Sequence, residues 1–286
     1  MSATRDELGA GRALWAPYRA VLAARFALFL QYRGAAVAGV VTQLWWGGLK
    51  VAILAAFYGA ASGGRAPLPL AGAITYTWMT QGLFALLPWM ADPEVARAIR
   101  SGDVAYDRVR PVDIYSLWFA RAAGWIAART LPRAVLLLGF AGLGLRALGL
   151  GAWAWRPPAS AACAAAFALS LGLAVLLSTA MVMLTNAAAV ALRDERGVLT
   201  LVGPAVIVFS GNLLPLSLFP DALRPALALQ PLAGLLDIPV RIYTSQWAGR
   251  GAWAGLGLQA FWTVALVLLG RAGLARAFRR LEVNGG

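Results

Sequence analysis

The chain has 286 residues, of which 60% are hydrophobic and only 13% charged, and its formal net charge is +13. Soluble domains have roughly 45–50% apolar and about 25% charged residues. This composition argues against an ordinary soluble enzyme and against a disordered protein. The basic residues lie between long apolar runs, which indicates membrane topology and not a nucleic-acid partner.

Missing residue types exclude several chemistries. The chain has no histidine, so histidine-based acid–base catalysis and histidine-containing metal sites are excluded. Its single cysteine, Cys163, cannot form an internal disulfide, and we interpret it as a small buried apolar residue in an alanine-rich stretch. Its single lysine, Lys50, lies between Leu49 and Val51, so it is not part of a nucleotide-binding P-loop.

The first segment, residues 11–33, is apolar but carries four arginines. Arg12 and Arg19 are seven residues apart and share one face of a helix, whereas Arg25 lies off that face. Apolar side chains such as Trp15 would face lipid. This pattern is typical of a helix that lies in the membrane interface with its basic side toward anionic headgroups. The alternative, a seventh span, would place four arginines at membrane depth at high cost.

Two apolar runs follow, each long enough for a spanning helix of about 20 residues. They predict spans at residues 35–60 and 70–91, of which only the first carries a charge, Lys50. Polar side chains within spans tend to face a cavity or to hydrogen-bond a neighbouring helix. The candidates for a substrate pathway on these two spans are Gln43, Trp46, Lys50, Thr77, Trp78 and Gln81.

The most polar loop, residues 92–113, follows the second span. Asp92 suits a helix N-cap, Pro93 suits the first helical position, and Glu94 suits the positive end of the helix dipole. A serine and a glycine nine and ten residues after Asp92 predict the end of the helix. The result is a two-turn amphipathic helix, either a solvated loop helix or a docking helix for a cytosolic partner. Its candidate contact residues are Glu94, Val95, Arg97, Ile99, Arg100, Ser101, Gly102 and Asp103.

Three further spans are predicted at residues 122–147, 160–186 and 197–213. The uncharged run that contains the second of these is 36 residues long, which exceeds the ~30 Å membrane core at about 1.5 Å per residue. We therefore expect its helix to continue into the cytosol. Ser210 and Asn212 in the last of these spans are further pathway candidates.

Residues 213–249 are rich in proline yet far from polar. An uncharged stretch of 12 residues within them is too short to span and typical of a re-entrant or interfacial helix. Backbone at that depth must be covered by protein or line a wet cavity, so we predict either a structured outer lid or an interfacial hairpin with a packing role. The lid candidates are Pro215, Phe219 and Pro220, and a sixth span follows at residues 251–271.

The arginines set the orientation of these spans. With both termini cytoplasmic, 18 arginines lie in cytoplasmic segments and six lie outside, in agreement with the positive-inside rule. No cleaved signal peptide is expected, because Arg19 and Arg25 interrupt the first apolar segment. We expect a single membrane domain over residues 1–286.

Four segments resemble the cytoplasmic loop and the outer segment of ABC-2 type exporter permeases. They are EVARAIRSGD at 94–103, RPVD at 110–113, SGNLLPLSLFP at 210–220 and LAGLLDIP at 232–239. The likeness follows nearly the whole chain in order and is closest to a bacterial branch in which two different half-size permeases work with a separate ATPase. Gly234 and Asp237 depart from it, because relatives often carry phenylalanine and a more apolar residue there.

This resemblance implies an all-α membrane protein with an interfacial elbow helix, six transmembrane helices, a cytoplasmic coupling helix and outer re-entrant helices. It implies a non-catalytic permease subunit of an ATP-binding-cassette exporter in the bacterial inner membrane. The implied partners are two copies of an ATPase subunit, which would bind ATP and Mg²⁺, a second and different permease, and membrane lipids. No cofactor or metal is expected on this chain, and a hydrophobic or amphiphilic cargo such as a drug or lipid is favoured.

Three other classes remain as alternatives. A secondary transporter usually needs carboxylates inside its spans, and none of the predicted spans has one. A membrane-embedded enzyme of lipid or sugar transfer would need clustered acids for a metal, and Asp103, Asp107 and Asp113 lack a recognisable metal spacing. The last alternative is a scaffold or assembly factor without transport activity.

Overall fold

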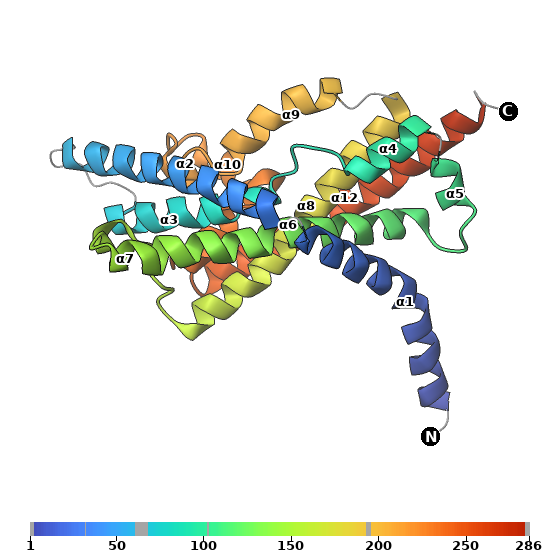
Figure 1. The fold of residues 1–286 in the computed structure, drawn as a ribbon, viewed down its shortest axis with the longest axis horizontal. Coiled ribbons are helices and arrows are strands. Elements are labelled where there is room, and N and C mark those ends of the chain that lie inside the picture. The colour runs from blue at the N-terminus through green and yellow to red at the C-terminus, as the bar shows by residue number, and fades with distance from the viewer. Residues whose placement is uncertain (1–2, 32, 61–67, 102, 193–195, 284–286) are drawn as a thin grey trace.

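The structure is a computed structural model, and it describes residues 3–31, 33–60, 68–101, 103–192 and 196–283. The fold is built from helices (Figure 1). The long helices are α1 (Ala3–Leu30), α2 (Arg33–Ala60), α6 (Ile114–Gly139), α8 (Ala161–Leu192) and α12 (Arg250–Val283). The shorter ones are α3 (Leu70–Gly82), α4 (Pro93–Ser101), α5 (Val104–Arg108), α7 (Leu145–Ala147), α9 (Arg196–Phe209), α10 (Arg224–Leu229) and α11 (Asp237–Tyr243). Single turns are η1 (Phe84–Leu86), η2 (Phe140–Gly144), η3 (Gly151–Trp153), η4 (Leu216–Leu218) and η5 (Pro231–Gly234). None of these described residues forms a β-strand, so the predicted all-α class is confirmed.

Four helical stretches are long and apolar enough to cross a membrane. They are Ala36–Ala60, Ile114–Ala147, Ala161–Ala191 and Arg250–Arg279. They fall on four of the six predicted spans, and the third of them extends beyond its predicted end, as the long apolar run indicated. The chain is therefore consistent with an all-α protein embedded in a membrane.

The second predicted span, residues 70–91, is not one continuous helix. α3 has 13 residues and ends at Gly82, so it is about 20 Å long, which is shorter than a ~30 Å membrane core. Beyond the short turn η1 the chain is extended at Leu87, and Pro88 cannot extend a hydrogen-bonded helix. For the residues after Gly82, the apolar run therefore predicts burial but does not predict a helix.

Two side chains from other helices satisfy this unwound backbone. Arg129 of α6 donates to the Leu87 carbonyl over 3.1 Å, and Ser178 of α8 donates to the Leu86 carbonyl. Leu86 and Leu87 are themselves fully buried. Irregular backbone at membrane depth persists only where protein supplies such hydrogen-bond partners. This explains why a charged residue, Arg129, lies within a span.

The fifth predicted span, residues 197–213, is likewise shorter than expected. α9 has 14 residues with Pro204 inside it, and it ends at Phe209. Gly211 then turns the chain with φ +83°, and a Cβ there would lie 2.3 Å from the Tyr76 hydroxyl. Glycine alone fits both the conformation and the space. Figure 1 shows α9 standing apart from α8 and α12 toward its N-terminal end.

The most extensive helix pair is α8 with α12. The two helices run in the same direction, because Ser170 hydrogen-bonds Gln259 over 2.8 Å in the N-terminal third of both helices, while Ala187 lies 3.7 Å from a Cβ built on Gly273 in the C-terminal third of both. Small residues on α8 permit this close approach, as is usual between membrane helices. The pair forms the central support for α6, α11 and α4.

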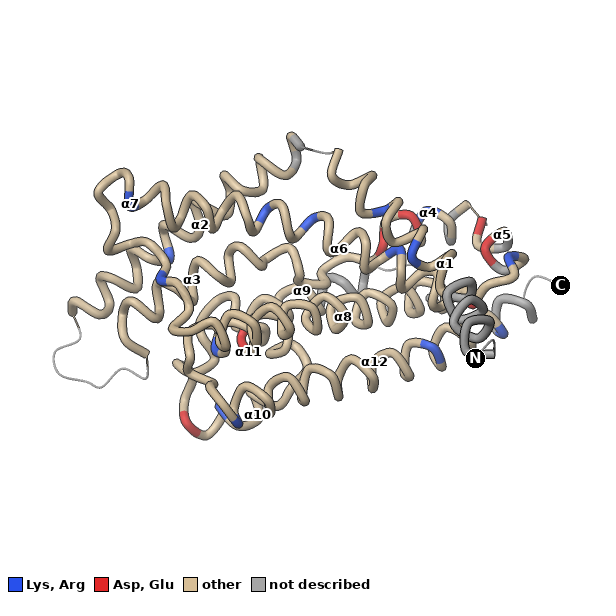
Figure 2. Tube along the Cα trace, turned by 90° about the horizontal axis from the view of Figure 1, so that it is seen from below, with Lys and Arg blue, Asp and Glu red and all other residues tan. Residues whose placement is uncertain are grey.

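Charged residues gather at one end of the bundle, where α1, α4 and α5 meet the C-terminal half of α12 (Figure 2). The opposite end carries α7 and α10, with fewer charges. The apolar α8–α12 pair joins these two ends. A bilayer around the middle of the bundle would place the charged end on one side and the short outer helices on the other.

Candidate functional site

α4 lies at the charged end of the bundle, as the sequence predicts. The Asp92 side chain accepts a hydrogen bond from the Glu94 backbone N–H over 2.9 Å, Pro93 is the first helical residue, and Ser101 is the last. The predicted N-cap and helix end are therefore confirmed. Of the predicted contact residues, Gly102 and the side chains of Ile99 and Arg100 lie outside the described residues.

α4 has one face in the protein and one face in solvent. Val95 is fully buried, whereas Arg97, Ser101 and Asp103 are exposed. The Ser101 hydroxyl donates to the Asp103 carboxylate over 2.6 Å, which holds these two polar groups together at the end of the helix. The exposed groups form a small polar surface of both charge signs.

Glu94 differs from the exposed Arg97 of the same helix, because it turns toward the chain's own α1. Arg25 of α1 forms an ion pair with Glu94 and a second one with Asp92 over 2.9 Å. The Asp92 side chain is fully buried, and the Arg25 side chain is only 7% exposed. Arg25 therefore joins α1 to the start of α4, which explains why it lies off the basic face of its helix.

Two further contacts fix this junction to the bundle. The Asp92 backbone N–H donates to the Asn186 side chain of α8 over 3.1 Å. Gly124 of α6 allows α1 to approach closely, because a Cβ there would lie 2.5 Å from the Leu22 carbonyl oxygen. The start of α4 is thus bonded to α1 and α8, and α1 is packed tightly on α6.

Among the predicted pathway residues, Lys50 and Asn212 come together. The Lys50 ammonium of α2 donates to the Asn212 backbone carbonyl over 2.8 Å and lies 3.3 Å from its side-chain oxygen. Lys50 is partly buried and forms no ion pair with any residue that the structure describes. The lysine therefore links α2 to the turn after α9. Ser210 in the same turn is fully buried.

The other pathway candidates separate into buried and exposed groups. Thr77 and Gln81 of α3 are buried within the chain, and the Trp78 indole donates to the Trp153 carbonyl over 2.7 Å. Gln43 of α2 is also buried. Trp46, by contrast, is half exposed on the outer surface of α2. The eight residues thus do not line a single enclosed route in this chain.

The outer segment, residues 213–249, is held together by Asp237, which is fully buried. Its carboxylate pairs with Arg241 over 2.7 Å and accepts hydrogen bonds from the Tyr76 hydroxyl over 2.7 Å and the Leu216 N–H over 3.2 Å. Burial raises the pKa of Asp237, while these three partners favour its charged form. Sequence reasoning noted Asp237 only as a departure from a pattern, although its spacing of four from Arg241 is a helical ion-pair signal.

Of the lid candidates, Pro215 directly precedes Leu216, whose N–H contacts this buried acid. Pro215 is buried, Phe219 is half-buried and Pro220 is exposed. The Phe219 carbonyl accepts a hydrogen bond from Arg224 over 2.7 Å. The segment consists of short helices and turns, with no helix long enough to span among its described elements, in agreement with the sequence.

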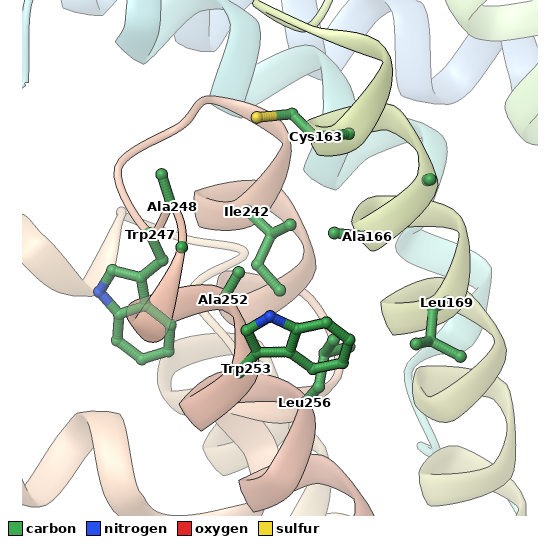
Figure 3. A pocket seen from close by; sticks show the side chains of 12 residues that line it. Cys163, Ala166, Leu169, Ile242, Trp247, Ala248, Ala252, Trp253 and Leu256 are labelled. Atoms are coloured by element: carbon green, nitrogen blue, oxygen red, sulfur yellow. The ribbon is translucent and has the colours of Figure 1, made fainter.

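A cavity of about 420 Å³ opens between the start of α8 and the turn from α11 to α12 (Figure 3). Cys163 and Leu169 lie on the α8 side, and Trp247 and Trp253 lie on the other. Cys163 is half-exposed and lies 3.3 Å from the Ser245 hydroxyl, so its interpretation as a buried residue is wrong. None of the eight predicted pathway residues lines this cavity.

No protein-family model matches the chain, and no curated protein is significantly similar to it.

Proposed function

We propose that this chain is the permease subunit of an ATP-driven exporter, in which α4 is the coupling helix that docks on a separate ATPase. The observation that carries the proposal is the placement of α4. It presents Arg97 and Ser101 to solvent at the charged end, with Asp103 just beyond it, while its start is bonded to α1 and α8 through Arg25 and Asn186. A partner that binds the exposed residues could therefore move the membrane helices.

The energetic logic is that of coupling between two sites. ATP binding in the partner would change the position of α4, and the free energy of that change would be shared with the arrangement of the long helices. Arg97 of α4 and Asp103 just beyond it are exposed and carry opposite charges, so they can form polar contacts that are made and broken at modest cost. Glu94 would act within the junction, because Arg25 already engages it.

The substrate pathway would be completed by a second permease against α2. Every fourth residue of α2 forms an apolar stripe of exposed side chains: Val37, Val41, Trp45, Leu49, Ile53 and Phe57. Trp46 borders this stripe, and Lys50, which contacts Asn212, lies on the same helix. A second permease on this face would enclose Trp46 and Lys50 between two chains. Apolar and aromatic surroundings favour an amphiphilic or hydrophobic cargo.

Co-purification tests this proposal. The full chain is purified from its native membranes with a mild detergent, and bound proteins are identified by mass spectrometry. The expected result is an ATPase with a Walker A motif, together with a second permease. Arg97→Glu should abolish ATPase binding, whereas Arg276→Glu, an exposed arginine of α12, should preserve it. Absence of an ATPase, or equal loss in both variants, would contradict the proposal.

A further inference from the structure

A groove of about 330 Å³ lies beside α1, between that helix, α6 and α12. Its floor is apolar: Phe119 of α6, Leu176 of α8 and Val267 of α12 line it. Two alanines of α6, Ala120 and Ala123, leave the space that larger side chains would fill. The volume is within the range of small-molecule sites, roughly 300–1,000 Å³.

Two arginines stand in this groove. Arg19 of α1 is exposed and forms no ion pair or hydrogen bond with any residue that the structure describes. Arg271 of α12 pairs with Asp113 over 3.0 Å, donates to Ser116 over 2.7 Å and lies 4.8 Å above the Tyr115 ring. Asp113 is the one acid within ion-pair distance of Arg271 among described residues, so the pair of arginines retains a positive charge.

Aromatic side chains flank the same groove. Trp15 is 65% exposed and packs edge-on against Tyr18 at 6.0 Å, and the Tyr18 hydroxyl accepts a hydrogen bond from the Asp113 N–H. Indole and phenol rings beside arginines are typical of the level at which lipid headgroups meet acyl chains. The groove also lies where α6 begins and where the apolar part of α12 ends.

We propose that this groove is a binding site for one phospholipid with an anionic headgroup. The phosphate and its negatively charged substituent would contact Arg19 and Arg271, and an acyl chain would occupy the apolar floor between α6 and α12. Charge complementarity identifies the occupant: a cationic rim next to an apolar slot fits an anionic amphiphile better than a free anion or a zwitterionic lipid. The proposal needs only that the long helices lie in a bilayer, and it does not depend on the proposed transport function.

Such a lipid would stabilise the position of α1. α1 contacts the bundle mainly along α6, and its N-terminal part leaves the bundle in Figure 1. A lipid bound between Arg19 and Arg271 would bridge α1 to α12, a contact that the protein itself does not supply through these two side chains. Ligand binding to the folded state alone raises its stability.

Native mass spectrometry of the full chain, titrated with dioleoyl phosphatidylglycerol or dioleoyl phosphatidylcholine, tests the site. We expect at least several-fold tighter binding of one phosphatidylglycerol. Arg19→Gln should weaken it about fivefold, the effect of one basic residue at a membrane surface, while Arg276→Gln leaves it unchanged. Leu176→Trp, which fills the groove, should weaken both lipids, and Leu268→Trp, on the exposed face of α12, should not.

Three results would overturn the proposal. The first is equal affinity for the two lipids in the wild-type chain. The second is unchanged phosphatidylglycerol binding in both Arg19→Gln and Leu176→Trp. The third is competition by glycerol 1-phosphate at concentrations similar to those of the lipid, which would identify a site for a free anion. Thermal melting of each variant without lipid confirms that it is folded.

Discussion

Arg25 of α1 and Asp92 at the start of α4 form an ion pair of 2.9 Å in which both side chains are almost completely buried. The pair joins a helix at the charged end to the helix proposed to dock a partner. Asp92 also caps α4 by accepting from the Glu94 N–H. One carboxylate thus has a local role in forming α4 and a tertiary role in fixing its position.

Arg25→Met is expected to destabilise the chain strongly. It leaves the Asp92 carboxylate buried without its cation, which typically costs about 3–5 kcal/mol. Glu94→Gln is the matched variant, because it removes the partner whose side chain is 40% exposed and should cost much less. Equilibrium unfolding in mixed micelles measures the loss of stability in both variants. Equal losses would contradict the prediction that the buried ion pair contributes more than the exposed one.

Gly211→Ala should destabilise the turn after α9. Its φ of +83° disfavours any Cβ, and the added methyl would lie 2.3 Å from the Tyr76 hydroxyl. Strain of this kind costs on the order of 1–3 kcal/mol. Gly249→Ala is the control, because Gly249 also has positive φ but open space around its Cβ position. The melting temperature of Gly211→Ala should be well below that of Gly249→Ala. The reverse order would be inconsistent with the packing described.

Ser178→Ala tests the unwound segment after α3. The substitution leaves the buried Leu86 carbonyl without its partner from α8, at a cost of about 1–3 kcal/mol. Ser210→Ala makes the same chemical change at another fully buried serine, but the hydroxyl there donates to the Ile207 carbonyl of the preceding helix α9, over a longer distance of 3.4 Å. Unfolding midpoints should fall further for Ser178→Ala. A larger loss of stability for Ser210→Ala would argue that the Ser178 hydrogen bond does not stabilise the unwound segment after α3.

Acid should weaken the start of α6 through Asp113. Burial would raise the pKa of Asp113, but hydrogen bonds from Ser116 and the charge of Arg271 outweigh it and lower the pKa below the ordinary value of 3.8. A depressed carboxyl pKa contributes stability that is present above the unfolded value and is lost as pH falls through the folded value. Melting temperature should therefore drop in acid below about pH 4. In Asp113→Asn that part of the drop should be absent. If this variant kept the same dependence of melting temperature on pH as the wild type, the ion pair would not be its cause.

Local chemistry and long apolar runs made part of this structure predictable. Helices α2, α8 and α12 follow from apolar runs of about 20 residues or more, whereas α6 carries Arg121, Arg129 and Arg133 within its length. α4 follows from a cap, a proline and a helix end that lie within ten residues of one another. These signals are local, so they can be interpreted without knowing what packs against them.

Contacts between distant residues were not predictable in the same way. The unwound stretch after Gly82 is as apolar as a spanning helix, and Arg129 and Ser178, from two other helices, hydrogen-bond its carbonyls there. Lys50 and Asn212 were both chosen as polar groups in spans, yet nothing in the sequence indicated that they meet across 162 residues. Asp237 was noted only as an exception to a pattern, because its partners Tyr76 and Leu216 become neighbours only in the fold.

Cysteine accessibility at residue 101 tests the central claim most directly, since a coupling helix must face the cytoplasm. In a Cys163→Ser background, Ser101→Cys places a thiol on the exposed end of α4, and Asp221→Cys places one on the 89% exposed side chain at the opposite end. A membrane-impermeant maleimide is added to intact cells and then to permeabilised cells. The account predicts labelling at 221 in intact cells and labelling at 101 only after permeabilisation. Labelling at 101 in intact cells would contradict it.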